Sequence, residues 1–114
     1  MPTPRPGTPV RGSATGRPIM AAMDLFGRRW ALRILWELRA GPLGARALLA
    51  QCDEMSSSVL YQRLRELTAS GIIARSADGY ELTELGEALS HALRPLDEWA
   101  VTWAQAQGSR PRDE

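Results

Sequence analysis

The sequence is poor in the residues that cross-link small proteins. It has a single cysteine, Cys52, so no disulfide can form within the chain. It also has a single histidine, His91, and together these two residues do not make the ligand set of a zinc site. We therefore expect no disulfide, no metal and no cofactor. Because His91 has no cysteine or serine partner at a catalytic spacing, we do not expect an enzyme.

Long apolar runs are also absent. The nearest approach, residues 20–38, is interrupted by charged residues and a glycine: Asp24, Gly27, Arg28, Arg29, Arg33 and Glu37. A transmembrane helix needs about 20 consecutive apolar residues, and the first residues lack the apolar middle region of a secretory signal. We therefore expect that the protein does not contact a membrane. We expect it to be located in the cytoplasm.

Lysine is missing altogether, and the net charge of +1 conceals a polarised chain. Residues 1–50 carry eight arginines and two acids, whereas residues 51–114 carry six arginines and eleven acids. Such asymmetry is compatible with a nucleic-acid or membrane contact, but equally with a solvated arginine-rich face. With 114 residues the chain fits one domain with little spare core area, so a partner chain would add stability.

The composition divides the chain into three parts. Residues 1–17 contain four prolines and three glycines and bury little, which predicts a flexible N-terminal arm. Residues 18–107 carry the helical and strand patterns of a folded domain, including a C-terminal dimerisation helix. The polar residues 108–114 are expected to form a disordered tail.

Three helices are expected in the first half of the domain. The first begins at Pro18 and ends at Gly27, and the second spans Arg28–Arg39. The second helix is apolar on two sides, so one side is expected to pack in the core and the other against a second subunit. Arg28 and Arg29 are expected to solubilise this helix. A third, short helix is expected over Leu43–Gln51.

A fourth helix, residues 56–69, has the clearest pattern. Ser56 is a plausible N-cap, and Leu60, Leu64 and Leu67 form an inward stripe. The opposite face is polar and includes Gln62 among its serine, tyrosine and arginine residues. These side chains can donate hydrogen bonds to phosphates or base edges.

A hairpin and a long helix complete the pattern. We expect strands from Ile72 to Arg75 and from Tyr80 to Leu82, joined by a turn at Asp78-Gly79, where both residues tolerate positive φ. Thr83 then caps a helix whose apolar residues recur at three and four positions as far as Trp103. Pro95 is expected to kink or interrupt this helix.

Two short helices joined by a tight link and followed by a hairpin are typical of a winged helix-turn-helix. The predicted fold class is mainly α with a small β-hairpin wing, and double-stranded DNA is the favoured partner. The candidate DNA-binding residues are Ser56, Ser57, Ser58, Tyr61, Gln62, Arg63, Arg65 and Arg75. Gln62 and Arg65 are suited to read adenine and guanine edges. The alternative for both is solvated helix surface, with Arg65 in a local pair with Glu66 or another acid.

The ordered motifs of this chain resemble those of the HxlR-type winged-helix regulators of bacteria. They are Gly-Arg-Arg-Trp at 27–30, Leu-Tyr-Gln-Arg-Leu-Arg-Glu-Leu at 60–67, Gly-Ile-Ile-Ala-Arg at 71–75 and Leu-Thr-Glu-Leu-Gly at 82–86. The resemblance covers residues 18 to about 103. It implies a homodimer joined through its N-terminal and C-terminal helices, which binds an inverted-repeat operator and regulates a neighbouring gene.

The sequence departs from that family in two places. Where the family often has a cysteine before the proline, this chain has Arg17 before Pro18, so thiol sensing at that position is excluded. The wing is also short, and Arg75 is its basic candidate for a DNA contact. Cys52 is expected to be an inert small residue, because neighbouring acids raise a thiol pKa.

Large apolar residues on the first, second and last helices are candidates for a dimer interface or a ligand pocket. They are Met20, Met23, Leu32, Trp36, Leu96, Trp99 and Trp103. Interface packing is the expected role, because large aromatic residues dominate such surfaces. The alternative is a pocket between subunits for a flat aromatic effector, which would make the chain a small-molecule binding protein. A winged helix used only for protein contacts is a further alternative.

Overall fold

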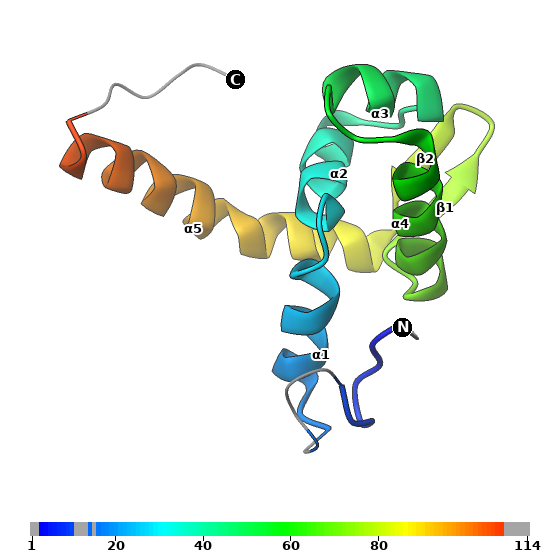
Figure 1. Ribbon diagram of the computed structural model, residues 1–114, viewed down its shortest axis with the longest axis horizontal. Helices are drawn as coiled ribbons and strands as arrows, with labels where there is room; N and C mark the ends of the chain where they lie inside the picture. The colour runs from blue at the N-terminus through cyan, green and yellow to red at the C-terminus, as the bar shows by residue number, and fades with distance from the viewer. Residues whose placement is uncertain (1–2, 11–13, 15, 109–114) are drawn as a thin grey trace.

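The computed structural model describes residues 3–10, 14 and 16–108 (Figure 1). The remaining residues of the predicted arm and tail lie outside this part. Five α-helices, one 3-10 turn and one hairpin follow in the order α1 (Pro18–Phe26), α2 (Ala31–Glu37), η1 (Leu38–Ala40), α3 (Ala45–Gln51), α4 (Ser57–Ala69), β1 (Ile73–Ser76), β2 (Gly79–Leu82) and α5 (Glu84–Ala106). The predicted class, mainly α with a small hairpin, is confirmed.

The core lies where α2, α3, α4 and the base of the hairpin meet. The predicted stripe of α4, Leu60, Leu64 and Leu67, is fully buried. It packs in one cluster with Ile34 and Leu48, from α2 and α3. Burying an aliphatic side chain of this size stabilises the fold by about 1.5–3 kcal/mol. The polar face of α4 is therefore directed away from the core.

Two helices begin later than the sequence pattern predicts. The second begins at Ala31, because Trp30 adopts a left-handed conformation with φ of 75° and separates Arg28 and Arg29 from the helix. The third begins at Ala45, because Leu43 pairs with the hairpin. These boundaries correct the predicted ranges.

The hairpin turns one residue earlier than predicted. Ser76 pairs with Gly79, so Ala77 and Asp78 form the turn. Of the two residues that tolerate positive φ, Gly79 adopts it, with a φ of 121°, and Asp78 does not. Its neighbour Tyr80 exchanges two backbone hydrogen bonds with Leu43, of 2.8 and 3.0 Å. This extra bridge ties the segment before α3 to the wing.

The last helix is continuous. The Thr83 hydroxyl accepts a hydrogen bond from the Gly86 amide at 3.2 Å, which confirms the predicted cap. Pro95 lies inside α5 and does not interrupt it. The outer half of α5 projects beyond the rest of the described chain (Figure 1), and Trp99 and Trp103 stack there with ring centroids 5.5 Å apart. Among the described residues, no helix has the length and apolar character needed to cross a bilayer.

Candidate nucleic-acid interface

Two short helices, α3 and α4, form the candidate interface together with the hairpin. The link between them is anchored by Cys52 and Met55, whose side chains are both buried. The Met55 amide donates a hydrogen bond to the Cys52 carbonyl at 3.0 Å. Ser56 caps α4, because its Oγ accepts from the Val59 amide at 3.2 Å. The link is therefore short and anchored, as a helix-turn-helix requires.

The outer face of α4 is polar and exposed. Ser57, Ser58, Tyr61, Gln62 and Arg65 are exposed, as the sequence pattern predicts. The Ser56 hydroxyl lies 3.2 Å from that of Ser58, so the start of the helix presents several hydroxyl groups side by side. A helix N-terminus with free N–H groups and hydroxyls is suited to bind a phosphate.

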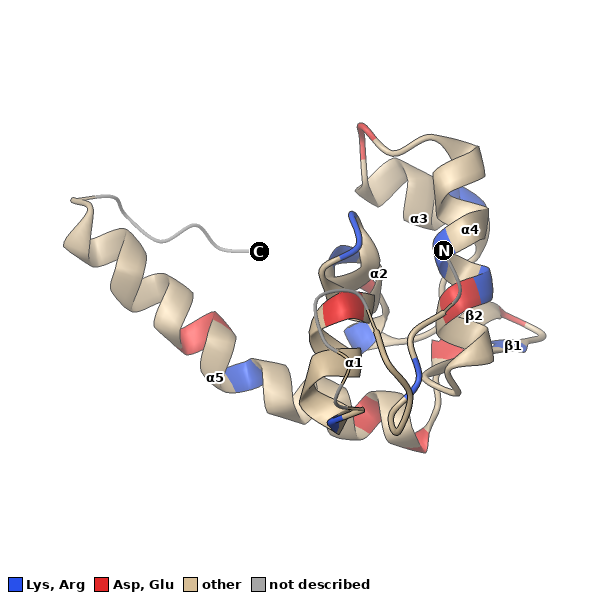
Figure 2. Ribbon diagram, turned by 60° about the horizontal axis from the view of Figure 1, so that its bottom comes forward, with Lys and Arg blue, Asp and Glu red and all other residues tan. Residues whose placement is uncertain are grey.

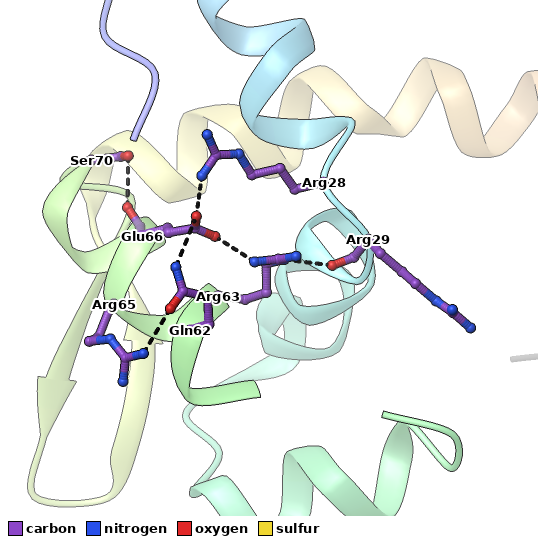
Figure 3. A network of polar contacts seen from close by, with 7 residues as sticks. All are labelled: Arg28, Arg29, Gln62, Arg63, Arg65, Glu66 and Ser70. Carbon is purple, nitrogen blue, oxygen red and sulfur yellow. Dashed lines mark hydrogen bonds and ion pairs between the residues drawn. The ribbon is translucent and has the colours of Figure 1, made fainter. Parts of the chain in front are cut away.

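Arg65 and Gln62 are linked on this face. Arg65 Nη2 donates to Gln62 Oε1 at 2.8 Å (Figure 3). Glu66 is not the partner of Arg65, because its carboxylate is directed into the molecule and paired with other arginines. The expected alternative of an Arg65–Glu66 pair is therefore not what the structure shows.

Arg63 is not among the exposed residues on the outer face of α4. Its guanidinium donates from Nε to the Arg29 carbonyl at 2.7 Å and from Nη1 to Glu66 at 2.9 Å. The side chain is 18% exposed. Arg63 therefore fastens α4 to the turn before α2 and is not presented as a free cation on the polar face.

Glu66 is a buried carboxylate with three neighbours. The residue is 4% exposed and pairs with Arg28 and Arg63, while Gln62 Nε2 lies 3.5 Å from its Oε2 (Figure 3). Arg28 is thus a structural residue, which corrects the expectation that it solubilises the second helix; Arg29 is exposed. The i,i+3 spacing of Arg63 and Glu66 was a sequence signal for half of this cluster, but nothing local indicated Arg28.

The hairpin places one cation beside the interface. Arg75 on β1 is exposed, and its guanidinium carbon lies 5.5 Å from the centre of the Tyr80 ring. Arg46, in the first turn of α3, is also exposed and was not among the predicted site residues. Figure 2 shows basic positions on both helices of the α3–α4 pair.

The predicted dimer and pocket residues fall into two groups. Met20, Leu32 and Trp36 are partly buried, and the Trp36 ring is covered by Arg39 at 3.8 Å. Met23, Leu96, Trp99 and Trp103 are exposed large apolar side chains. From Trp99 to Ala106, α5 carries no charged residue (Figure 2). Its outer half therefore offers an apolar surface with two stacked indoles.

A cavity of about 1200 Å³ lies elsewhere, and none of the four tryptophans lines it. Its walls come from the segment 3–10, from α1, from residues 69–72 at the end of α4 and before β1, and from the start of α5. Ala21, Leu25, Ile72 and Leu89 supply apolar surface, and Arg5 and Asp24 supply charge. Trp30 lines a smaller cavity of about 250 Å³ with Phe26 and Leu32.

Cys52 is buried with 1% of its surface exposed. Burial raises the pKa of its thiol; Arg33 opposes this effect, and Glu37 and Asp53 reinforce it. A raised pKa leaves the thiol protonated near neutral pH and therefore a poor nucleophile. This environment agrees with the expected inert role. No group of histidine, cysteine, aspartate and glutamate side chains in the described ranges is arranged to hold a metal ion.

Comparison with known proteins gives consistent results. Residues 25–108 match the model of the HxlR-like helix-turn-helix family. The helix-turn-helix transcriptional regulator YvaP of Bacillus subtilis is 30% identical over 89 residues, which cover 72% of this chain and 82% of YvaP. YodB of the same organism is 30% identical over 87 residues, covering 70% of this chain and 78% of YodB.

Solved structures of relatives have the same fold as this chain. The quinone-bound structure of YodB from B. subtilis superimposes with a TM-score of 0.69 at 31% identity, and covers 74% of this chain and 96% of that one. Residues 25–108, which match the family model, span the helix-turn-helix, the hairpin and α5.

Proposed function

The chain belongs to the HxlR-like helix-turn-helix family and is a helix-turn-helix transcriptional regulator, and from this premise we propose that it binds an inverted-repeat operator as a homodimer and represses transcription. Each subunit would place α4 in a major groove, with the two copies of α4 about 34 Å apart. Repression would follow from exclusion of polymerase from the promoter.

The polar face of α4 is the observation that carries this proposal. It is the exposed side of a helix whose other side is locked in the core, so its side chains are held on a rigid support. We assign base readout to this face, phosphate contacts to the α4 start and to Arg46, and a groove contact to Arg75 on the wing. Arg63 is left out of this set because its guanidinium is bound to Glu66 and to the Arg29 carbonyl.

The homodimer is proposed on the exposed apolar residues of α1 and α5. Ile19 and Met23 on α1 and Leu96, Trp99 and Trp103 on α5 are each more than half exposed. The stacked Trp99 and Trp103 form contiguous exposed apolar surface, and such surface marks an interaction site. Pairing of these helices between two copies would cover it and would set the spacing of the two α4 helices.

A fluorescence anisotropy titration tests DNA binding. The purified protein is titrated against labelled DNA from its own upstream intergenic region, with unrelated DNA as competitor and at several salt concentrations. We expect specific binding that weakens steeply with salt, because phosphate contacts release counterions. Equal binding to both DNAs would contradict the proposal and favour a ligand-binding or protein-contact role.

A second candidate function is small-molecule sensing. Two observations favour it: YodB, a relative, has been solved with a quinone bound, and this chain has a large, mostly apolar cavity beside α1 and α5. We propose that a small aromatic effector occupies this cavity and changes the position of α1 relative to α5, because both helices line it. The expected Trp-lined pocket would then be replaced by one lined mainly by aliphatic residues.

Ligand-induced release from DNA tests the effector proposal. A benzoquinone and a non-electrophilic aromatic of similar size are added to the DNA complex, and anisotropy is followed. Loss of binding with wild-type protein, reduced in an Ala22→Trp variant that fills the cavity, is the expected result. An equal response of both proteins would place the effector elsewhere.

A further inference from the structure

The side-chain amide of Gln62 lies between two charged groups of opposite sign on α4. Its Oε1 accepts from Arg65 Nη2 at 2.8 Å, and its Nε2 makes a longer contact of 3.5 Å with Glu66 Oε2 (Figure 3). Both ends of the amide are thus engaged before any DNA is bound. Gln62 is therefore not free to offer its amide to an adenine edge without giving up Arg65.

The charge of Glu66 fixes which end of the amide faces Arg65. An ionised carboxylate only accepts hydrogen bonds, and a guanidinium only donates them. The reversed amide would place Oε1 against the Glu66 carboxylate and the NH2 group against Arg65, so both contacts would be repulsive. The observed orientation is the one that satisfies Glu66 and Arg65 together.

The Glu66 carboxylate is itself held from two directions. Arg28 pairs with Oε2 from the turn after α1, and Arg63 pairs with Oε1 from the same helix at 2.9 Å. Arg63 is in turn fastened to the Arg29 carbonyl at 2.7 Å. A bidentate set of charge-assisted bonds leaves a buried carboxylate little freedom to rotate.

We propose that Glu66 and Gln62 are positioning residues, and that they hold the Arg65 guanidinium ready to read one base pair. The proposal rests on the proposed function, since it concerns the same face of α4. A flexible arginine reads guanine bidentately only when its planar fork is aligned. Gln62 uses one N–H donor of Arg65 for this alignment and leaves the others available to the DNA.

The first experiment uses the DNA-free protein. ¹⁵N relaxation of the Arg65 Nε–H group is compared in wild type, Gln62→Met, Glu66→Gln and the control Thr68→Ala, an exposed change on the same helix. We expect the Arg65 order parameter to fall in the first two variants and to stay unchanged in the control. An unchanged Arg65 in both Gln62→Met and Glu66→Gln overturns the proposal.

The second experiment measures discrimination between the operator and operators with one base pair changed. We expect Gln62→Met and Glu66→Gln to lose about tenfold discrimination at the base pair that Arg65 reads, with binding to unrelated DNA unchanged. For the exposed Gln62→Met, a merely structural role would instead weaken binding to both DNAs and lower Tm. If Glu66→Gln does not fold, the result for the exposed Gln62→Met variant decides the proposal. The Gln62→Met/Arg65→Ala double variant should lose no more discrimination between operators than Arg65→Ala alone.

The two experiments separate this proposal from the proposed function. A wild-type protein with no preference for its operator overturns the proposed function and, with it, the readout by Arg65. The relaxation measurement still decides whether Glu66 and Gln62 position the guanidinium.

Discussion

Gly86 in the first turn of α5 packs directly on the backbone carbonyl of Ile72, the residue before β1. A β-carbon at Gly86 would overlap that carbonyl oxygen. The neighbouring Thr83 strengthens the same junction: its hydroxyl donates toward the carbonyls of Gly71 and Ile72, at 2.6 and 3.0 Å, and accepts from the Gly86 amide. The Leu-Thr-Glu-Leu-Gly motif is thus a joint between the wing and the last helix.

A Gly86→Ala variant should be markedly less stable. The added methyl group meets backbone atoms that cannot move away, so we expect a loss of about 1–3 kcal/mol, the typical range of overpacked sites. Urea unfolding followed by circular dichroism measures it. Glu87→Ala, an exposed change one residue further, is the control and should stay within about 0.5 kcal/mol of wild type. Equal stability of both variants would show that the joint is not tight.

Arg63 and Arg65 should respond in opposite ways to the same substitution. Arg63→Ala removes hydrogen bonds to the buried Glu66 and to Arg29, so the free energy of unfolding should fall by about 1.5–3 kcal/mol. Arg65→Ala removes an exposed side chain and should leave Tm nearly unchanged. It should instead cost about 1–3 kcal/mol of discrimination at one base pair of the operator.

Thermal unfolding and anisotropy titrations of both variants check this pair. The two positions are matched in residue type and lie two residues apart on α4, so each serves as the control for the other. A loss of stability in Arg65→Ala equal to that in Arg63→Ala would mean that Arg65 is structural. Discrimination lost to the same extent in a folded Arg63→Ala would return Arg63 to the DNA-binding set.

The periodic parts of the fold were predictable from the sequence. Leu60, Leu64 and Leu67 recur at helical spacing, and Ser56 and Thr83 stand at the helix starts, so local chemistry was enough to identify α4 and α5. The exposed polar face of α4 follows from the same periodicity.

The rest depends on contacts between distant segments. Arg63 lies at the flank of the helix. Its side chain is directed inward because the Arg29 carbonyl and the Arg28–Glu66 pair lie beside it, and residues 28 and 29 are more than thirty positions away in the sequence. Leu43 pairs with Tyr80 through a single bridge, which has no periodic signal and which shortens the third helix. Trp30 takes a left-handed conformation for which its residue type gives no indication.

Cys52 should make stability depend on alkaline pH. Burial raises its pKa in the folded state, so the folded protein holds the proton over a range where the unfolded chain, with a thiol pKa of about 8.5, has lost it. The stabilising contribution is complete below about pH 8.5 and declines as the pH rises toward the folded-state value, by at most about 1.4 kcal/mol per pH unit.

Chemical denaturation of wild type and Cys52→Ala between pH 7 and 10 measures this effect. As the pH rises, the free energy of unfolding of wild type should fall relative to that of Cys52→Ala. Modification of the wild-type thiol by iodoacetamide at pH 7 should be slow until denaturant is added. A rapid reaction of the folded protein would contradict the inert role of Cys52.

The stacked pair Trp99 and Trp103 provides the sharpest test of the homodimer. Both rings are more than half exposed in the single chain, on a part of α5 that carries no charge. If a second copy covers them, truncation of a central aromatic should cost about 2 kcal/mol or more of association free energy. Sedimentation velocity should then show Trp99→Ala and Trp103→Ala dissociating at concentrations where wild type is dimeric.

The control variant is Thr102→Ala, an exposed change on the same turn, which should remain dimeric. Operator affinity should fall in parallel with dimerisation, because each half-site needs its own α4. A monomeric wild type, or tryptophan variants with unchanged mass, would remove α5 from the interface.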